Sequence, residues 1–322
     1  MKQSKRLVIV LGSLFLASPA MGENFSDCLS EIQRAASAEG ISTSTLRKVF
    51  NGLRPDARVI KLDRHQPERI LTLDEYLQRV VPETRIHQGG SLLMRHAEML
   101  QKISERFGVE AELLVALWGI ETDFGRVLGR FDVTRSLATL ACDARRPAFF
   151  KNELLHHLHL LDQDPHQRFP LQGSWAGAFG YLQFLPSVLR CYGVDQNKDG
   201  RIDIFSPSED LFATAASYLH ASGWRAGRPW GAELRPPYPL CVTERQCPES
   251  PQAFLAQADL SLDLKKHLLS AVGPVRVIYG SGAPTRYFLA MPNFEALLKW
   301  NRSDKYAIAV GLLMDGLKTA SH

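Results

Sequence analysis

The segment from 113 to 126 constrains the fold of this chain most, because a carboxylate stands there where an apolar side chain is expected. Read as a helix, the segment has a core face formed by Leu113, Leu114, Leu117 and Trp118, and the next position on that face is Glu121. A carboxylate held against apolar side chains loses hydration in its charged form, so we expect the pKa of Glu121 to be raised. A carboxylic acid that keeps its proton near neutral pH is what general-acid cleavage of a glycosidic bond requires.

A structural role for Glu121 is the competing interpretation. In that case the carboxylate would be paired with Arg126 or with another cation, because ion pairs also shift pKa values away from active sites. The rest of the chain decides between the two interpretations.

The first 22 residues are typical of a secretory signal peptide. Three basic residues precede the apolar stretch 7–17, and small residues follow it up to Gly22. That stretch is too short for a comfortable bilayer span, so we expect a periplasmic protein with no transmembrane segment in the mature chain. Ser26 and Asp27 precede Cys28 and match a lipid-attachment site poorly, so we do not expect a lipid anchor.

The charge balance argues against nucleic acid as a partner. The full chain of 322 residues carries 38 basic and 34 acidic side chains, and removal of the signal leaves 35 against 34. A nucleic-acid surface needs an excess of positive charge that this chain lacks. With 45% hydrophobic residues, the chain can bury a substantial core, as one large or two small domains.

The cysteines remain open to more than one pairing. Export to an oxidising compartment favours disulfides, and Cys241 and Cys247 are close enough in sequence to close a small loop. Cys142 can pair with Cys191, which would leave Cys28 unpaired.

Periodicity predicts a mainly α-helical protein with a small strand-containing insertion. An amphipathic helix is expected over 91–107, after Gly89 and Gly90 and before Gly108. Further helices are expected over 113–125, 135–141, 147–161, 294–300 and 304–317. The Pro- and Gly-rich region 225–251 interrupts them, and strands over 275–279 and 286–291 flank a hairpin signal at 280–284. We therefore divide the mature chain into an N-terminal segment (23–90), a core (91–225), a strand-containing subdomain (226–293) and C-terminal helices (294–322).

The stretch 174–187 has the composition of a sugar-binding loop. Its glycines allow close backbone approach, and aromatic residues such as Tyr181 offer flat faces on which sugar rings stack. Ser174 and Gln183 could bond the polar edges of a sugar. The alternative is a Gly-rich turn that is packed by aromatics and leads into a helix at Pro186.

The stretch 195–203 resembles the first half of a calcium-binding loop. Oxygen ligands would come from the side chains of Asp195, Asn197 and Asp199 and from the backbone carbonyl of Arg201. Ser206 stands at the twelfth position, where a bidentate acid is usual, so Glu209 or Asp210 would have to complete the site. We favour Asp210 because it keeps register with the following helix. The alternative is an Asx-rich surface turn.

Together these stretches resemble the lytic murein transglycosylase B family, whose members cleave peptidoglycan and have a lysozyme-like helical core. The resemblance runs from about residue 91 to the C-terminus. It rests on Gly119-Ile120-Glu121-Thr122, the 174–186 stretch, the calcium-like loop, 215–219 before Ser222-Gly223-Trp224, and 300–307. It implies that Glu121 is the sole catalytic acid/base. It also implies that the substrate-binding residues include Ser174, Tyr181, Gln183, Tyr218, Asn301 and Tyr306, with Arg145 and Arg146 near the peptide stem.

Two residues depart from the family pattern. Phe149 and Trp300 stand where tyrosines are expected, so hydroxyl contacts would be lost and stacking kept. The resemblance further implies glycan strands, muropeptides and other cell-wall enzymes as partners. It implies a structural calcium ion but no cofactor for the chemistry.

A single carboxylate implies a lyase. Glycosidases ordinarily use two acids, and Asp123 should point to another side of the helix than Glu121. The substrate's N-acetyl group and its C6 hydroxyl would replace the second acid, and the product would be 1,6-anhydromuramic acid. The alternatives are a hydrolytic muramidase, a non-catalytic peptidoglycan-binding protein and a calcium-binding interaction protein.

Overall fold

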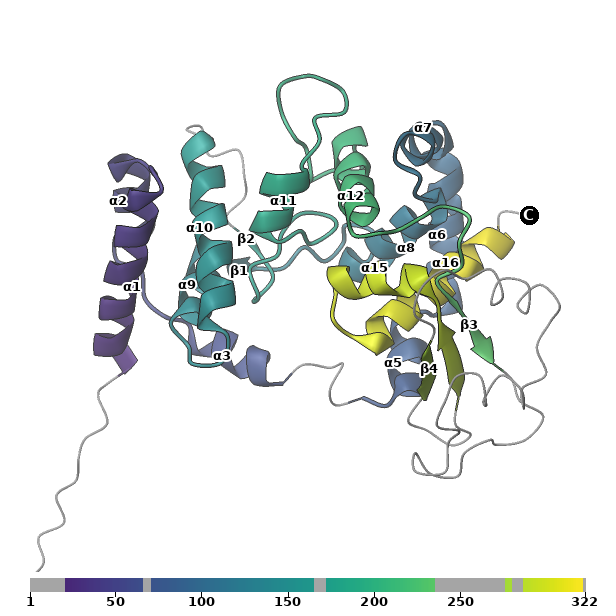
Figure 1. Cartoon of the computed structure of the whole chain (residues 1–322), viewed down its shortest axis with the longest axis horizontal. Helices are drawn as coiled ribbons and strands as arrows, with labels where there is room; N and C mark the ends of the chain where they lie inside the picture. Colours follow the sequence, from purple (N-terminus) through teal and green to yellow (C-terminus); the bar gives the residue numbers. More distant parts are fainter. Residues whose placement is uncertain (1–20, 66–70, 165–171, 235–275, 280–285, 321–322) are drawn as a thin grey trace, which may run out of the picture.

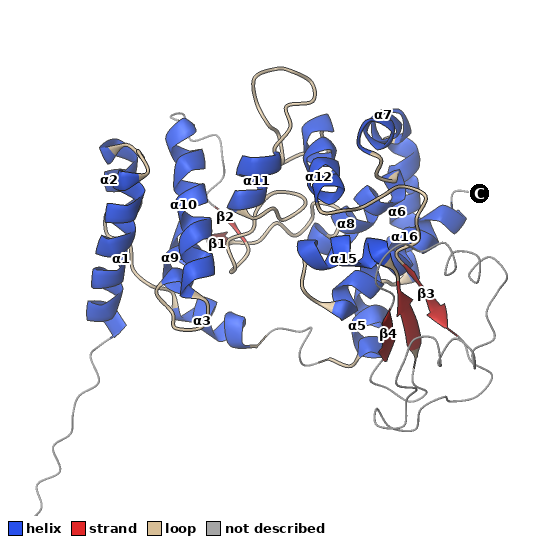
Figure 2. Ribbon diagram, in the orientation of Figure 1, coloured by secondary structure: helices blue, strands red, loops and turns tan. Residues whose placement is uncertain are grey.

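The computed structural model describes residues 21–320 except 66–70, 165–171, 235–275 and 280–285. The described part is mainly α-helical, with a few short strands, as predicted (Figure 2). Its helices are α1 (Met21–Ala38), α2 (Thr43–Phe50), α3 (Ala57–Arg64), α5 (Leu73–Val80), α6 (Glu83–Arg95), α7 (Ala97–Phe107), α8 (Ala111–Thr122), α9 (Val133–Ala141), α10 (Pro147–Gln163), α11 (Pro186–Tyr192), α12 (Glu209–Ala221), α15 (Pro292–Trp300) and α16 (Asp304–Ala320). Its strands are β1 (Phe131–Asp132), β2 (Gln172–Gly173), β3 (Gly231–Leu234), β4 (Arg276–Tyr279) and β5 (Tyr287–Ala290).

Helix α8 lies at the centre of the helical core (Figure 1). It packs against α6, α7, α12 and α16, and every residue from Leu113 to Gly119 is buried. The segment is therefore buried on all sides, beyond the single core face that its periodicity predicts. An apolar helix is stable in this setting because its neighbours exclude water from every face.

The helix predicted over 91–107 is wrong at both its start and its middle. Helix α6 begins at Glu83 and runs through Gly89 and Gly90. The helix is interrupted at His96, and α7 begins at the next residue. The two glycines are part of a helix–helix contact: a Cβ atom added to Gly89 would lie 2.7 Å from Cδ2 of Leu317 on α16. The glycines thus allow α16 to approach α6 closely. Local sequence rules treat a pair of glycines as a helix boundary, so they do not predict this packing role.

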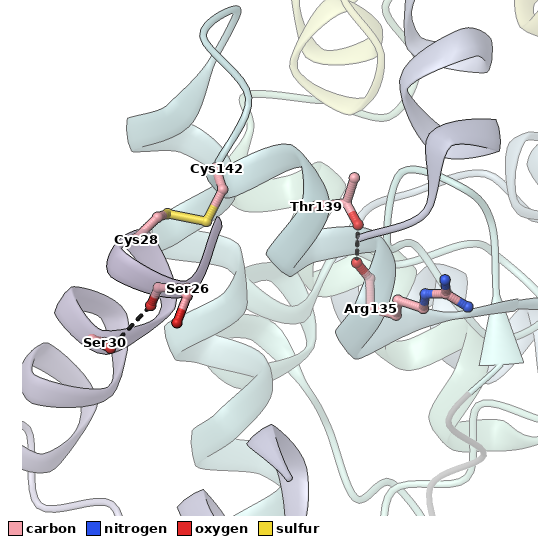
Figure 3. Close-up of a disulfide and its surroundings, with 6 residues drawn as sticks. All are labelled: Ser26, Cys28, Ser30, Arg135, Thr139 and Cys142. Atoms are coloured by element: carbon pink, nitrogen blue, oxygen red, sulfur yellow. Dashed lines mark hydrogen bonds between the residues drawn. A yellow bond between two sulfur atoms is a disulfide. The ribbon is translucent and has the colours of Figure 1, made fainter. Parts of the chain in front are cut away.

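A disulfide between Cys28 and Cys142 fastens α1 to the end of α9 (Figure 3). The Cα atoms of the two cysteines are 5.9 Å apart, within the usual range for a disulfide. The pairing of Cys142 with Cys191 is therefore wrong, and Cys191 is an exposed free thiol. Helix α1 packs beside α10, which places Cys28 next to the C-cap residue of α9, a proximity that sequence spacing does not reveal. Cys241 and Cys247 lie outside the described residues.

The insertion contains a three-stranded antiparallel sheet in the order β3–β5–β4. The central strand β5 is buried along its whole length, and Tyr287 pairs with Tyr279 on one side and with Leu234 on the other. The predicted pairing of 275–279 with 286–291 is confirmed, and the turn between them lies outside the described residues. No helix in the described part of the chain is long and apolar enough to span a membrane, and the predicted signal lies almost wholly in 1–20, outside that part.

Candidate active site

Glu121 lies in the last turn of α8, where two other helices supply hydrogen-bond donors to its carboxyl group. The hydroxyl of Tyr306, on α16, donates to Oε1 of Glu121 at 2.5 Å. The indole N–H of Trp300, at the end of α15, donates to the same oxygen at 2.8 Å. Glu121 is half-buried, Tyr306 is buried, and both donors are uncharged. The core thus holds one carboxyl oxygen in a fixed position through two uncharged donors.

Trp300 makes a polar contact where we predicted only that a tyrosine hydroxyl contact is lost and stacking is kept. We expected the contact of the tyrosine hydroxyl to be lost, but the indole N–H donates to Glu121. The ring also packs against Tyr218, with 5.6 Å between ring centroids, and against Phe184 at 5.8 Å. Trp300 therefore combines a hydrogen bond to the carboxyl group with an aromatic surface beside it.

Asp123 does not belong to the same group. The chain leaves α8 through Asp123 and Phe124, whose φ angles of 52° and 58° place both in the left-handed region. The side chain of Asp123 forms salt bridges with Arg126 at 2.8 Å and with Arg85 at 3.3 Å. Hydrogen bonds from Arg126, and then from Arg85, hold the pKa of Asp123 below its usual value. Asp123 is thus paired with Arg126 and Arg85, and its exclusion as a partner carboxylate for Glu121 stays a prediction.

The Gly-rich stretch is attached to the end of α8 immediately beside Glu121. The hydroxyl of Thr122 donates to the carbonyl of Tyr181 at 2.7 Å and accepts the amide proton of Gly125 at 2.9 Å. The ring of Tyr181 stacks on Trp118, with centroids 6.2 Å apart. Gly125 has a φ of 84°, and a Cβ atom there would lie 2.4 Å from the Tyr181 ring, so only glycine fits. The role of Thr122 as a tether was not evident from the sequence, because its partner is 59 residues away.

Gln183 and Ser174 give shape to the same stretch. Gln183 adopts a φ of 48°, and its side-chain amide donates to the carbonyls of Gly180 at 2.9 Å and Leu128 at 3.2 Å. The hydroxyl of Ser174 accepts the amide proton of Ala178 at 3.0 Å, which closes a turn. Helix α11 begins at Pro186, as the sequence predicts.

Tyr218, on α12, reaches the site through its ring contact with Trp300. Its hydroxyl donates to the carbonyl of Lys299 at 2.8 Å, and burial raises its pKa. Its ring also packs against Tyr192 at 5.1 Å. Asn301 caps the C-terminus of α15 directly after Trp300. The predicted residues Trp300, Tyr306 and Tyr218 thus gather around Glu121, with Asn301 next to them in the chain.

Arg145 and Arg146 form a separate cluster with a buried acid. Asp63, on α3, is 2% exposed and forms salt bridges with Arg145 at 2.5 Å and with Arg146 at 2.9 Å. The guanidinium of Arg146 also lies over the ring of Phe149, which is exposed. Asp63 could not be identified from the sequence, because its partners are 82 and 83 residues away and nothing local marks it.

The calcium-like loop is closed by hydrogen bonds to its own backbone. Oxygens of Asp195 and Asn197 both accept the amide proton of Asp199, at 3.1 and 3.0 Å. Buried Asp210 reaches the loop from α12 and accepts the amide proton of Gln196 at 2.7 Å. Arg201, whose backbone carbonyl is the predicted calcium ligand, lies two residues after Asp199 in the same loop. Within the described ranges, no three His, Cys, Asp or Glu side chains converge closely enough to form a metal centre.

Comparison with known proteins places this architecture in one family. Residues 24–315 match the model of the transglycosylase SLT domain. The chain is 30% identical over 246 residues to membrane-bound lytic murein transglycosylase B of Escherichia coli (strain K12), a match that spans 73% of this chain and 64% of that relative.

Solved structures agree with this match. SltB3 from Pseudomonas aeruginosa, in complex with NAG-anhNAM-pentapeptide, is 35% identical, with a TM-score of 0.77 over 94% of this chain and 81% of that one. Soluble lytic transglycosylase SltB1 from the same organism is 28% identical, with a TM-score of 0.71 over 92% of this chain and 98% of that one. Lytic transglycosylase Slt35 of Escherichia coli, in complex with calcium, shares the fold at 24% identity, with a TM-score of 0.75 over 93% of this chain and 94% of that one. The chain therefore belongs to the family defined by the transglycosylase SLT domain.

Proposed function

We propose that this protein is a lytic transglycosylase of peptidoglycan. It cleaves the β-1,4 bond between N-acetylmuramic acid and N-acetylglucosamine and leaves 1,6-anhydromuramic acid ends. The observation that carries the proposal is the half-buried carboxyl group of Glu121, whose Oε1 accepts hydrogen bonds from Tyr306 and Trp300. Its substrates are glycan strands and muropeptides, and its location is the periplasm, where this polymer lies.

Glu121 acts first as acid and then as base. Tyr306 and Trp300 both donate to Oε1 and orient the carboxyl group that carries the mobile proton. Glu121 gives this proton to the glycosidic oxygen as the bond to the anomeric carbon breaks. The N-acetyl group of the muramic acid stabilises the positive charge at that carbon. The C6 hydroxyl of the same sugar then attacks the carbon, and its proton returns to Glu121, so no water is consumed.

Neutral donors suit this cycle because the carboxyl group must exist in both protonation states. Tyr306 and Trp300 orient the group by hydrogen bonds, whereas a guanidinium would strongly favour the ionised form. Asp123, which is paired with two arginines, is unsuited to the role of a second acid or base. A hydrolytic muramidase remains the competing activity and differs in its products.

The test is the substitution Glu121→Gln, with Asp123→Asn as the matched control two residues away. The amide keeps the size of the side chain but cannot transfer the proton, so release of muropeptides from purified sacculi should fall about 10²–10⁴-fold. The melting temperature should remain close to that of the wild type. The Asp123→Asn protein should keep most of the wild-type activity, when activity is expressed per amount of folded protein. Near-normal digestion by the Glu121→Gln protein would refute the assignment.

We also propose that the 195–210 region binds a structural calcium ion. The donor set of carboxylate, amide and carbonyl oxygens matches the preference of this ion. The shared amide proton of Asp199 shows that oxygens of Asp195 and Asn197 already face one point, and Asp210 faces the same loop. Calcium would be held by Asp195, Asn197, Asp199, the Arg201 carbonyl and Asp210, and it would connect the loop to α12. The three carboxylates accept backbone amide protons in the structure and would have to turn toward the ion.

Calcium binding should raise the melting temperature by mass action. We expect an increase of a few degrees in millimolar calcium relative to chelator, and we expect Asp199→Ala to abolish the increase. The control is Asp27→Ala, at an exposed position on α1. A melting temperature that is the same in calcium and in chelator would mean that the loop is an Asx-rich turn.

A further inference from the structure

A pocket with polar and apolar walls lies beside the aromatic residues that surround Glu121. It has a volume of about 450 Å³. Its lining includes Tyr192, Tyr218, Ser222, Leu298, Lys299 and Arg302. Tyr218 is shared with the candidate active site, since its ring packs against Trp300, which donates to Glu121. We call this pocket the Lys299 pocket.

The Lys299 pocket carries positive charge without a carboxylate in its wall. Its two charged residues, Lys299 and Arg302, are exposed, and its full lining, which lies entirely within the described residues, contains no Asp or Glu. The ammonium group of Lys299 donates to the carbonyl of Ser222 at 2.9 Å, which holds the side chain across the pocket. An ammonium group has three donors, so a bond to one carbonyl leaves capacity for an anion.

The Arg145–Arg146 pair presents a different electrostatic surface. Both guanidinium groups contact the buried carboxylate of Asp63, so much of their charge is satisfied inside the protein. An anionic ligand there must share its cations with Asp63. At the Lys299 pocket a ligand would meet two cations, and the wall of the pocket offers no competing carboxylate.

We propose that the Lys299 pocket binds a carboxylate of a peptidoglycan stem peptide. This inference rests on the proposed function, because a peptidoglycan strand that reaches Glu121 brings its stem peptides to the surrounding surface. Carboxylates are the anionic groups of those peptides, and Lys and Arg bind them through charge-assisted hydrogen bonds. The two tyrosines and Leu298 provide apolar contact for the peptide that bears the carboxylate.

The pocket would therefore contribute to the choice of substrate and not to the chemical step. A strand whose stem carboxylates are neutralised should still reach Glu121 but should bind more weakly. The contribution should be screened by salt, because both cations are exposed.

Binding in the Glu121→Gln background separates this role from turnover. The ligand is a disaccharide pentapeptide, used either unmodified or with its carboxylates converted to amides, and affinity is measured by calorimetry. We expect amidation to weaken binding roughly tenfold. The double substitution Lys299→Gln and Arg302→Gln should weaken binding of the unmodified ligand by a similar factor and leave binding of the amidated ligand unchanged.

Two further variants act as controls. Arg47→Gln with Lys48→Gln removes two exposed charges from α2 and should leave both affinities unchanged. Lys299→Arg keeps the charge and should preserve discrimination between the two ligands. Melting curves check that each variant is folded.

The outcomes distinguish this proposal from the proposed function. If the double variant binds both ligands as its parent does, the pocket does not bind the stem carboxylate, although the enzyme can still be a transglycosylase. If the parent binds neither ligand and the wild type releases no product from sacculi, the proposed function itself fails.

Discussion

Two carboxylates in this protein each bind two donors from other parts of the chain, yet the donors differ in kind. Glu121 accepts hydrogen bonds from the hydroxyl of Tyr306 and the indole of Trp300. The carboxylate of Asp63 forms salt bridges with the guanidinium groups of Arg145 and Arg146. Glu121 is half-buried, and Asp63 is 2% exposed.

The difference in donors separates a carboxyl group that is oriented by uncharged groups from one that is paired with two cations. Cationic donors strongly favour the ionised form, because protonation would leave their charges uncompensated. Neutral donors also fix the orientation of a carboxyl group, but they favour its ionised form less strongly than cations do. The Asp63 region is thus suited to holding α3 against the start of α10, and the Glu121 region is suited to proton transfer.

The neutral donors should matter to the rate of the reaction. Trp300→Phe and Tyr306→Phe each remove one donor to Oε1, and we expect each to lower kcat roughly tenfold. Loss of a donor to the carboxylate disfavours its charged form, so the alkaline limb of the pH–rate profile should move to higher pH. Trp300→Tyr restores a hydroxyl donor and should recover part of both effects. A Trp300→Phe enzyme that changes KM alone, with an unmoved pH profile, would restrict Trp300 to stacking against the substrate.

The charged donors should matter to stability instead. Asp63→Asn leaves Arg145 and Arg146 without their anion, and both are partly exposed, so the free energy of unfolding should fall by about 1–3 kcal/mol. Denaturant unfolding measures this change, with exposed Asp27→Asn as a control that should have little effect. Activity at low temperature should stay within about twofold of the wild type. Loss of activity at unchanged stability would mean that Asp63 takes part in the chemistry, which would erase the contrast with Glu121.

Local pattern was sufficient for the parts of this molecule that depend on local chemistry. The apolar run before Glu121 predicted α8, and the turn signal at 280–284 predicted the pairing of β4 with β5. Asp123 was excluded as a second acid from its position alone, and its salt bridges with Arg85 and Arg126 are compatible with that prediction.

Contacts between distant segments could not be predicted in this way. Gly89 has the sequence signature of a helix boundary, but it lies inside α6 and packs against α16. The Cys28–Cys142 disulfide joins residues 114 positions apart, and Asp63 meets its arginines across a similar range. Trp300 shows a further limit: its N–H replaces a hydroxyl only because α15 presents the indole edge to α8. These features depend on how helices pack, which no single segment encodes.

The origin of the atoms in the product tests the central claim most directly. If the C6 hydroxyl of the sugar is the nucleophile, digestion of sacculi in ¹⁸O-labelled water should give muropeptides that end in 1,6-anhydromuramic acid, one water lighter than hydrolytic products and without label. Mass spectrometry of the released muropeptides reads both properties at once. Labelled products with reducing ends as the major species would contradict the account, because water would then be the nucleophile and a second group would have to activate it.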